Sequence, residues 1–126
     1  MSKKRKVRRV RVQQKQWKWF GYAGHFIMGH DCRFRLCTRV GGFLISTVGD
    51  LRDERTGDAR EIGCGRKFET FVFKAGPVCN DPKCDCGLPT QGGGEIDSLP
   101  ANTAGNAQRN HYEMCEKYSR RAGVVP

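Results

Sequence analysis

A segment of alternating polar and apolar residues, broken once by two adjacent glycines, constrains the fold of this chain more than any other feature. Residues 32–40 alternate with a period of two, which is typical of a strand whose two faces have different surroundings. Gly41 and Gly42 supply the positive φ values that a two-residue hairpin turn needs, and residues 43–48 return as an apolar partner strand. The sequence therefore predicts a β-hairpin in this part of the chain.

The two faces of the first strand of this hairpin differ in character. One face carries Cys32, Phe34, Leu36 and Val40, and the other carries Arg33, Arg35, Cys37 and Arg39. We expect the first face to lie in the core and the second to be charged surface, because successive side chains of a strand point to opposite faces.

Further strands are expected outside the hairpin. Residues 17–20, 25–28 and 68–73 are short aromatic or β-branched segments, which is typical of strands. Gly76 and Pro77 then predict the end of the last of these strands, because neither residue suits a strand interior.

The remaining segments predict loops and one helix. Residues 49–58 are polar and residues 77–100 are rich in Cys, Gly, Pro, Asn and Asp, so both are expected to lack regular structure. Asn102 or Thr103 can cap a helix that runs to about Arg121, because apolar residues recur there at helical spacing. We therefore expect an α+β fold with a small, mainly antiparallel β-sheet or partial barrel of about five strands, a Cys-rich loop and one C-terminal helix.

The positive charge is concentrated at the N-terminus. Lys and Arg number 23 against 13 Asp and Glu, but the first 18 residues hold nine basic side chains and no acid, which leaves 14 basic and 13 acidic residues elsewhere. We expect a basic disordered arm over residues 1–16 and a single, nearly neutral, zinc-stabilised β-rich domain over residues 17–126. No segment is apolar for long enough to span a bilayer, so no membrane partner is expected.

The arm predicts binding to nucleic acid or to a nucleoprotein complex, because a run of basic side chains binds phosphates without reading sequence. The predicted contact residues of the arm and the hairpin are Lys3, Lys4, Arg5, Lys6, Arg8, Arg9, Arg11, Lys15, Arg33, Arg35 and Arg39. A solubilising tail and a nuclear import signal are the alternative interpretations of a basic run. Trp17, Trp19 and Tyr22 follow the arm, where such residues either stack on bases or join the core.

Five potential zinc ligands gather in the second half of the chain: Cys79, Cys84, Cys86, His111 and Cys115. Cys84 and Cys86 face the same way in an extended chain, because they are two residues apart. The preferred set is the three loop cysteines with Cys115, and His111 is the substitute, since the two helix residues are four apart and share one face. A closed shell of protein ligands predicts a structural zinc ion. The alternative is that these thiols are small buried apolar groups.

A second candidate ligand site lies around Gly63, Gly65 and Arg66. These residues predict either a backbone nest for an anion, with the guanidinium beside it, or a tight turn. No paired carboxylates and no Ser/His/Asp arrangement with supporting context are present, so we do not expect an enzyme. His25, His30 and Asp31 are the residues to test if activity is found. Seven cysteines, an odd number, favour thiols or metal ligands in a reducing compartment over disulfides.

Most of the chain beyond the arm resembles a group of small uncharacterised bacteriophage and prophage proteins. The residues that carry the resemblance are Ala23-Gly24-His25-Phe26-Ile27, Cys32-Arg33-Phe34, Ser46-Thr47-Val48-Gly49, Ile62-Gly63, Phe68-Glu69-Thr70-Phe71-Val72-Phe73 and Cys84-Asp85-Cys86-Gly87-Leu88-Pro89. The resemblance implies a phage origin and the cytoplasm of a bacterial host, which argues against nuclear import. It also implies an accessory protein that acts by binding, because small accessory phage proteins typically bind nucleic-acid machinery or components of host defence. The alternative to nucleic-acid binding is therefore a counter-defence protein that inhibits a host defence protein or sequesters a nucleotide-like ligand.

Overall fold

The computed structural model describes residues 17–20, 32–63, 65–84 and 87–122, and the strand expected over residues 25–28 lies outside these ranges. Its elements are β1 (Trp17–Phe20), β2 (Cys32–Val40), β3 (Phe43–Arg52), β4 (Ala59–Arg60), β5 (Phe68–Val78), β6 (Pro89–Ala101) and α3 (Ala104–Ala122). The predicted class is confirmed, because the described strands form a small antiparallel β-sheet that is followed by one C-terminal helix.

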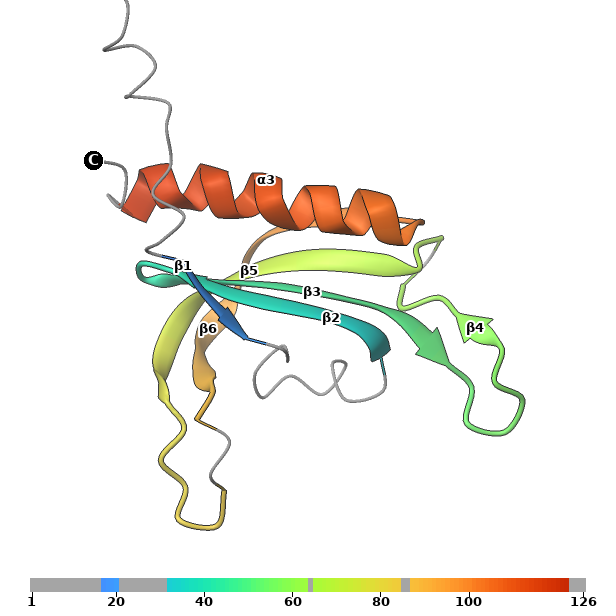
Figure 1. Ribbon diagram of the computed structural model, residues 1–126, viewed down its shortest axis with the longest axis horizontal. Helices are drawn as coiled ribbons and strands as arrows, with labels where there is room; N and C mark the ends of the chain where they lie inside the picture. Colours follow the sequence, from blue (N-terminus) through green and yellow to red (C-terminus); the bar gives the residue numbers. More distant parts are fainter. Residues whose placement is uncertain (1–16, 21–31, 64, 85–86, 123–126) are drawn as a thin grey trace, which may run out of the picture.

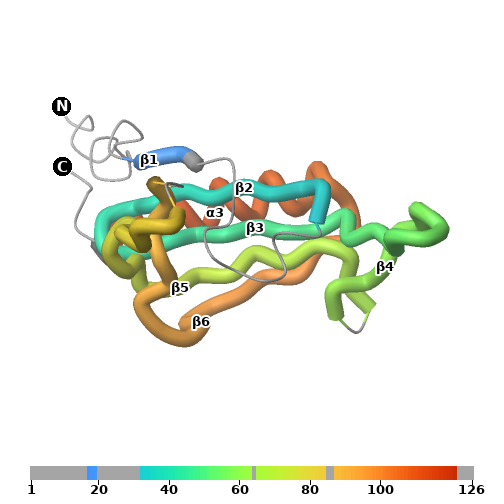
Figure 2. Tube along the Cα trace, turned by 90° about the horizontal axis from the view of Figure 1, so that it is seen from below, coloured from blue at the N-terminus to red at the C-terminus, as the bar shows by residue number. Residues whose placement is uncertain are grey.

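The sheet has the strand order β1-β2-β3-β5-β6, with β4 paired to the end of β3. Figure 2 shows these strands side by side, with β1 and β6 at opposite edges. The helix α3 crosses one face of the sheet and contacts β2, β3, β5 and β6 (Figure 1). The sheet curves away from the helix, so the face opposite α3 is concave.

The predicted hairpin is confirmed and forms the centre of the sheet. β2 and β3 pair without a register shift from Cys32 opposite Leu51 to Val40 opposite Phe43. Gly41 takes the positive φ at the turn, 58°. A side chain at Gly41 would therefore strain the turn, because L residues rarely adopt this conformation.

The polar loop after the hairpin is shorter than the sequence predicts. β3 continues to Arg52, so the loop expected over residues 49–58 is confined to residues 53–58. The Asp53 carboxylate accepts hydrogen bonds from two backbone N–H groups of this loop, at 2.8 and 3.1 Å. Such a side-chain turn lets the chain reverse within a few residues and return as β4.

The glycine-rich segment that was expected to lack regular structure is largely a strand. β5 runs through Gly76 and Pro77 to Val78, and β6 pairs with it through three register shifts. A Cβ atom at Gly92 would meet the carbonyl oxygen of Lys74 at 3.0 Å, so the missing side chain permits a close approach of the two strands. The prediction was wrong because local composition favours turns, whereas the long partner strand supplies the backbone hydrogen bonds that keep this segment extended.

The predicted C-terminal helix is confirmed as α3. Thr103 caps its start, because its Oγ1 accepts a hydrogen bond from the N–H of Asn106 at 3.1 Å. Arg120 and Arg121 lie in the last turn, where positive charge interacts favourably with the helix dipole. The largest core cluster, which joins the helix to the sheet, consists of Trp17, Val40, Ile45, Val72, Met114, Cys115 and Tyr118.

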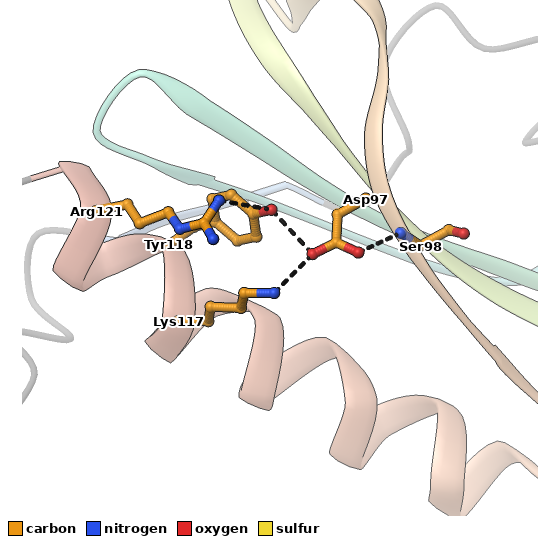
Figure 3. Close-up of polar contacts among 5 residues, drawn as sticks. All are labelled: Asp97, Ser98, Lys117, Tyr118 and Arg121. Atoms are coloured by element: carbon orange, nitrogen blue, oxygen red, sulfur yellow. Dashed lines mark hydrogen bonds and ion pairs between the residues drawn. The ribbon is translucent and has the colours of Figure 1, made fainter.

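A polar cluster fastens the second half of α3 to β6 (Figure 3). One carboxylate oxygen of Asp97 accepts hydrogen bonds from Lys117 Nζ at 2.8 Å and from the Tyr118 hydroxyl at 2.9 Å. Its other oxygen accepts a hydrogen bond from the N–H of Ser98 at 2.9 Å. The bond from Lys117 is the main cause that lowers the pKa of Asp97 below its ordinary value. These charge-assisted bonds hold an edge strand against the helix.

The concave face of the sheet is also buried, which corrects the expectation that the arginine-bearing face of β2 is wholly charged surface. Cys37 is only 1 % exposed and packs with Leu44 and Phe73 on this face. Side chains on a concave face converge, so Cys37, Leu44 and Phe73 bury part of one another's apolar surface.

The alternation of β2 is broken near its start. Cys32 is buried as expected, but it packs with Val48 and Leu51, whereas Phe34 packs on the helix side. The expectation that Cys32 and Phe34 share a face is therefore wrong. The physical reason lies in the paired strand, where Asp50 adopts a positive φ of 54° and interrupts the regular pleat.

Candidate nucleic-acid interface

Basic side chains gather on the face of β1 and β2 that points away from α3. Lys18 lies opposite Arg39 in the register of the two strands, so both side chains leave the sheet on the same face. Arg35 shares this face because it lies an even number of residues from Arg39. Arg33 lies at the irregular start of β2 and is exposed, while Arg35 and Arg39 are half-buried.

Several of these cations have no carboxylate partner among the residues that the structure describes. Within the described ranges, the salt bridges are Arg52–Asp50, Arg66–Glu69 and Lys117–Asp97. Lys18, Arg33 and Arg39 take part in none of these pairs, and Arg39 Nε donates instead to the carbonyl oxygen of Gly41 at 3.1 Å. Like charges directly opposite each other on neighbouring strands repel, so an anion bound near Lys18 and Arg39 would stabilise this edge of the sheet.

The two tryptophans of β1 have different surroundings. Trp17 is 5 % exposed, and its indole Nε1 donates a hydrogen bond to Ser119 Oγ at 2.6 Å. Trp19 is 47 % exposed, and its ring contacts that of Tyr112 with 5.6 Å between the centroids. Trp17 is therefore a core residue, whereas Trp19 lies at the surface; Tyr22 is outside the described residues.

The sequence did not single out Tyr112. The available signal was an aromatic residue on the polar side of an amphipathic helix, next to the apolar stripe. Its contact with Trp19 depends on where α3 crosses the sheet, because β1 and α3 lie at opposite ends of the chain. No local sequence pattern predicts a contact between residues so far apart in the chain.

The structure does not bring all of the predicted zinc ligands together. Cys79 and Cys84 are half-buried at the tip of the β5–β6 hairpin. Cys115 and His111 are fully buried residues of α3 itself. Figure 1 shows the helix and the hairpin tip on opposite sides of the sheet. Cys86 lies outside the described residues, and within them no group of three His, Cys, Asp or Glu side chains is placed to hold a metal ion.

His111 instead forms the centre of a buried hydrogen-bond network. Its Nε2 lies 2.8 Å from Thr38 Oγ1, and its Nδ1 lies 2.7 Å from Thr47 Oγ1. Thr47 Oγ1 is also 2.6 Å from Thr70 Oγ1, so the network joins α3 to three strands. Burial lowers the pKa of His111 to about 4, so its ring is neutral at pH 7. Both ring nitrogens are engaged by hydroxyl groups, which leaves neither available to a metal ion.

The segment around Gly63 and Arg66 forms a tight turn in which Gly65 and Arg66 each interact with a carboxylate of the chain. The two residues pair across the turn, and Gly65 between them has a positive φ of 75°. The N–H of Gly65 donates to the carboxylate of Glu61 at 3.1 Å. Arg66 Nε lies 3.2 Å from the buried carboxylate of Glu69, as an ion pair without hydrogen-bond geometry. Carboxylates therefore occupy the two positions that an anionic ligand would take.

Comparisons with known proteins identify no relative of this chain. No protein-family model, no curated protein and no solved structure matches it. The residues to test for activity, His25, His30 and Asp31, lie outside the described residues. In the part of the chain that the structure describes, no helix is both long enough and apolar enough to cross a membrane.

Proposed function

We propose that this chain is a non-catalytic phage accessory protein that binds nucleic acid or a nucleoprotein complex through its basic arm and the cations of β1 and β2. The observation that carries the proposal is the continuity of positive charge along this part of the chain. Residues 1–16 hold eight Lys and Arg and no acid, and β1 follows them directly. Lys18 and Arg39 then continue the charge on one face of the sheet, where neither has a carboxylate partner among the described residues.

Binding of this kind is expected to be sensitive to salt. If the arm and the strand neutralise about six phosphates, the logarithm of the binding constant falls against the logarithm of the salt concentration with a slope of about −5. Such contacts position a nucleic acid but carry no sequence information directly. We therefore expect the protein to bind many nucleic-acid sequences with similar affinity.

Removal of the arm tests the proposal. Fluorescence anisotropy of labelled DNA and RNA is measured at several salt concentrations for the full chain and for a chain without residues 2–15. We expect the deletion to abolish most of the salt-sensitive binding. The matched control keeps the length of the arm and replaces its Lys and Arg residues with Gln, so that charge is separated from chain length. Undiminished affinity in either variant would contradict the proposal.

Single substitutions on the strands test the second part of the interface. Lys18→Gln and Arg39→Gln are each expected to weaken binding to all sequences and to reduce the salt slope by about 1, because each removes one phosphate contact. Arg60→Gln is the control, since Arg60 is an exposed cation of β4, which pairs with the end of β3 that is remote from β1. Equal effects of all three substitutions would mean that the binding reports net charge alone.

Counter-defence activity is the alternative function, either by inhibition of a host defence protein or by capture of a nucleotide-like ligand. Gly65 and Arg66 line a surface cavity of about 250 Å³, which is the observation in its favour. An anionic ligand there must displace the carboxylates of Glu61 and Glu69 from their present partners. Activity that survives deletion of the arm but is lost in Arg66→Ala would select this alternative.

A structural zinc ion at the tip of the β5–β6 hairpin forms part of the proposal. Cys79, Cys84 and Cys86 provide three thiols within eight residues of a Gly- and Pro-rich loop. Such a loop offers few apolar side chains that could bury these thiols. Metal analysis of the purified protein is expected to find zinc that Cys84→Ser removes and Cys115→Ala retains. Loss of zinc in Cys115→Ala would instead support a ligand set shared between the loop and the helix, and absence of zinc from the intact protein would exclude the site.

A further inference from the structure

Two of the large apolar side chains at the surface form one contiguous patch. Among the described residues, the exposed ones are Trp19, Val78, Ile96 and Tyr112. The rings of Trp19 and Tyr112 are in contact at an angle of 60° between their planes, whereas Val78 and Ile96 belong to β5 and β6. Single exposed apolar residues are ordinary, but two exposed aromatic rings in contact indicate a binding surface.

The inner side of this patch is held in place by buried neighbours. The ring of Trp19 lies 6.1 Å from that of His111 and 5.8 Å from that of Trp17, measured between centroids. His111 is itself fixed by the threonine hydroxyls at both of its nitrogens, and Trp17 by its hydrogen bond to Ser119. The exposed part of Trp19 therefore presents a pre-organised aromatic surface, which loses little conformational freedom when a flat ligand binds.

We propose that Trp19 and Tyr112 form a stacking platform for unpaired bases, so that the nucleic acid bound by this protein is single-stranded. This inference rests on the proposed function and names its substrate class. Aromatic side chains beside a basic segment are the combination that binds single strands, because every unpaired base offers a flat face while the backbone follows the charge. In a duplex these faces are already stacked on one another.

The basic arm lies next to Trp19 in the sequence, whereas the part of α3 around Tyr112 adds no net positive charge. The arm ends at residue 16, three positions before Trp19 in the sequence, so a nucleic acid bound by the arm is held within a few residues of the platform. On α3, Arg109 and Glu116 lie about one turn on either side of Tyr112, and their charges cancel. Residues 108–116 of the helix therefore contribute an aromatic ring and no net positive charge, which favours a base over a phosphate as the group that contacts Tyr112.

The test compares single strands with duplexes under one salt condition. Anisotropy of labelled 20-nucleotide oligothymidylate, oligouridylate and a duplex DNA of the same length is measured with the full chain. We expect tighter binding to the single strands. Tyr112→Ala and Trp19→Ala are each expected to lower single-strand affinity about tenfold and to leave duplex affinity nearly unchanged. Ile96→Ala is the matched control, because Ile96 is a similarly exposed apolar residue on the opposite edge strand.

A fluorescence measurement provides a readout that loss of stability does not mimic. Oligothymidylate is expected to quench the tryptophan emission of the wild-type chain, because Trp19 is exposed to the base. Trp19→Phe keeps an aromatic ring at the site, so it should retain most of the affinity while the quenching disappears, since the remaining Trp17 is buried. Thermal unfolding of each variant confirms that it is folded at the temperature of the binding experiment, and Tyr112→Leu replaces Tyr112→Ala if the latter is not.

The outcomes separate this inference from the function on which it rests. If the full chain binds no nucleic acid at low salt, both the proposed function and the platform are wrong. If binding is salt-sensitive but equal for single strands and duplexes, and unchanged in Tyr112→Ala and Trp19→Ala, the proposed function stands and the platform is overturned. In that second case the aromatic patch would be a surface for a protein partner.

Discussion

Ser46 and Thr47 are neighbours on β3, and they show how differently the two faces of the sheet are built. Thr47 points towards α3, where its Oγ1 lies within hydrogen-bond distance of both Thr70 and His111. Ser46 points to the concave face, and its buried Oγ has no hydrogen-bond partner in the part of the chain that the structure describes. One face of the strand is thus a satisfied polar network, and the other is apolar packing that includes an unpaired hydroxyl.

The difference indicates that the helix-covered face specifies how the domain is assembled. Apolar surfaces tolerate small displacements, but a buried network is satisfied only when its donors and acceptors are all in register. His111 reaches Thr38 of β2 and Thr47 of β3, and Thr47 reaches Thr70 of β5. Helix α3 therefore docks in one position, which also determines where Tyr112 meets the edge strand β1.

Removal of His111 should disrupt the hydrogen-bond network on the helix-covered face and should have the largest effect on stability. His111→Ala is expected to lower the free energy of unfolding by about 3–5 kcal/mol. The substitution leaves a cavity, and the buried hydroxyls of Thr38 and Thr47 lose their hydrogen-bond partner. Urea denaturation measures the change. Gln108→Ala is the control on the exposed side of the same helix and should change stability by less than about 0.5 kcal/mol. A loss of less than about 1 kcal/mol in His111→Ala would show that the network is not a major source of stability.

Acid should weaken the same face through the protonation of His111. The pKa of His111 is lowered from an ordinary value of 6.5 to about 4 by burial, so the unfolded chain takes up a proton at a higher pH than the folded chain. The stabilising contribution is fully present above pH 6.5 and is lost as the pH falls towards 4, by about 3 kcal/mol in total. Urea denaturation at several pH values measures it.

Comparison with His111→Gln isolates this effect, because carboxyl groups such as Asp97 lose their own stabilising bonds in the same direction as the pH falls. The difference in stability between the wild type and His111→Gln should shrink as the pH falls from 6.5 towards 4. A difference that stays constant over this range would contradict the expected protonation of His111.

Substitution of Thr47 should produce a smaller loss than removal of His111. Thr47→Val keeps the shape of the side chain but removes the hydroxyl that pairs with Thr70 and His111. We expect a loss of about 2 kcal/mol in the free energy of unfolding, because two buried polar groups lose a partner. Thr47→Ser keeps the hydroxyl and provides the control, since it should lose only the contribution of one methyl group, about 1 kcal/mol.

Substitution of Ser46 should have the smallest effect and the opposite sign. Ser46→Ala removes a buried hydroxyl that makes no hydrogen bond to any described residue, so stability is expected to stay constant or to rise by about 0.5–1 kcal/mol. Thermal and urea denaturation of this variant and of Thr47→Val, measured side by side, compare the two faces directly. Equal losses in both variants would mean that the concave face also satisfies its hydroxyl group.

The parts of the fold that could be predicted are those set by neighbouring residues. The hairpin depends on alternation and on Gly41, and the helix start depends on Thr103, so both follow from short segments of sequence. β6 was missed because its glycines favour turns when they are considered alone, while its pairing with β5 overrides that preference. The buried character of Cys37 was missed because curvature of the sheet is not encoded in the alternation of β2.

The features of the candidate site also divide into those that the local sequence predicts and those that depend on tertiary packing. The arm and the arginines of β2 could be identified from charge and periodicity, because both are local properties of the chain. The contact of Trp19 with Tyr112 and the separation of Cys115 from the hairpin tip could not, because each depends on how α3 lies across the sheet. An amphipathic pattern shows which side of a helix is buried, but not which strand each residue meets.

The sequence by itself determined the position of the hairpin turn and the extent of the helix, and it placed the excess positive charge at the N-terminus. Only the tertiary structure decided that Trp17 is buried while Trp19 is exposed, and that His111 is a neutral member of a hydrogen-bond network. The physical reason is range: turn conformation, capping and periodicity act over a few residues. Burial, pKa and aromatic contact arise instead from packing between segments that are distant in the chain.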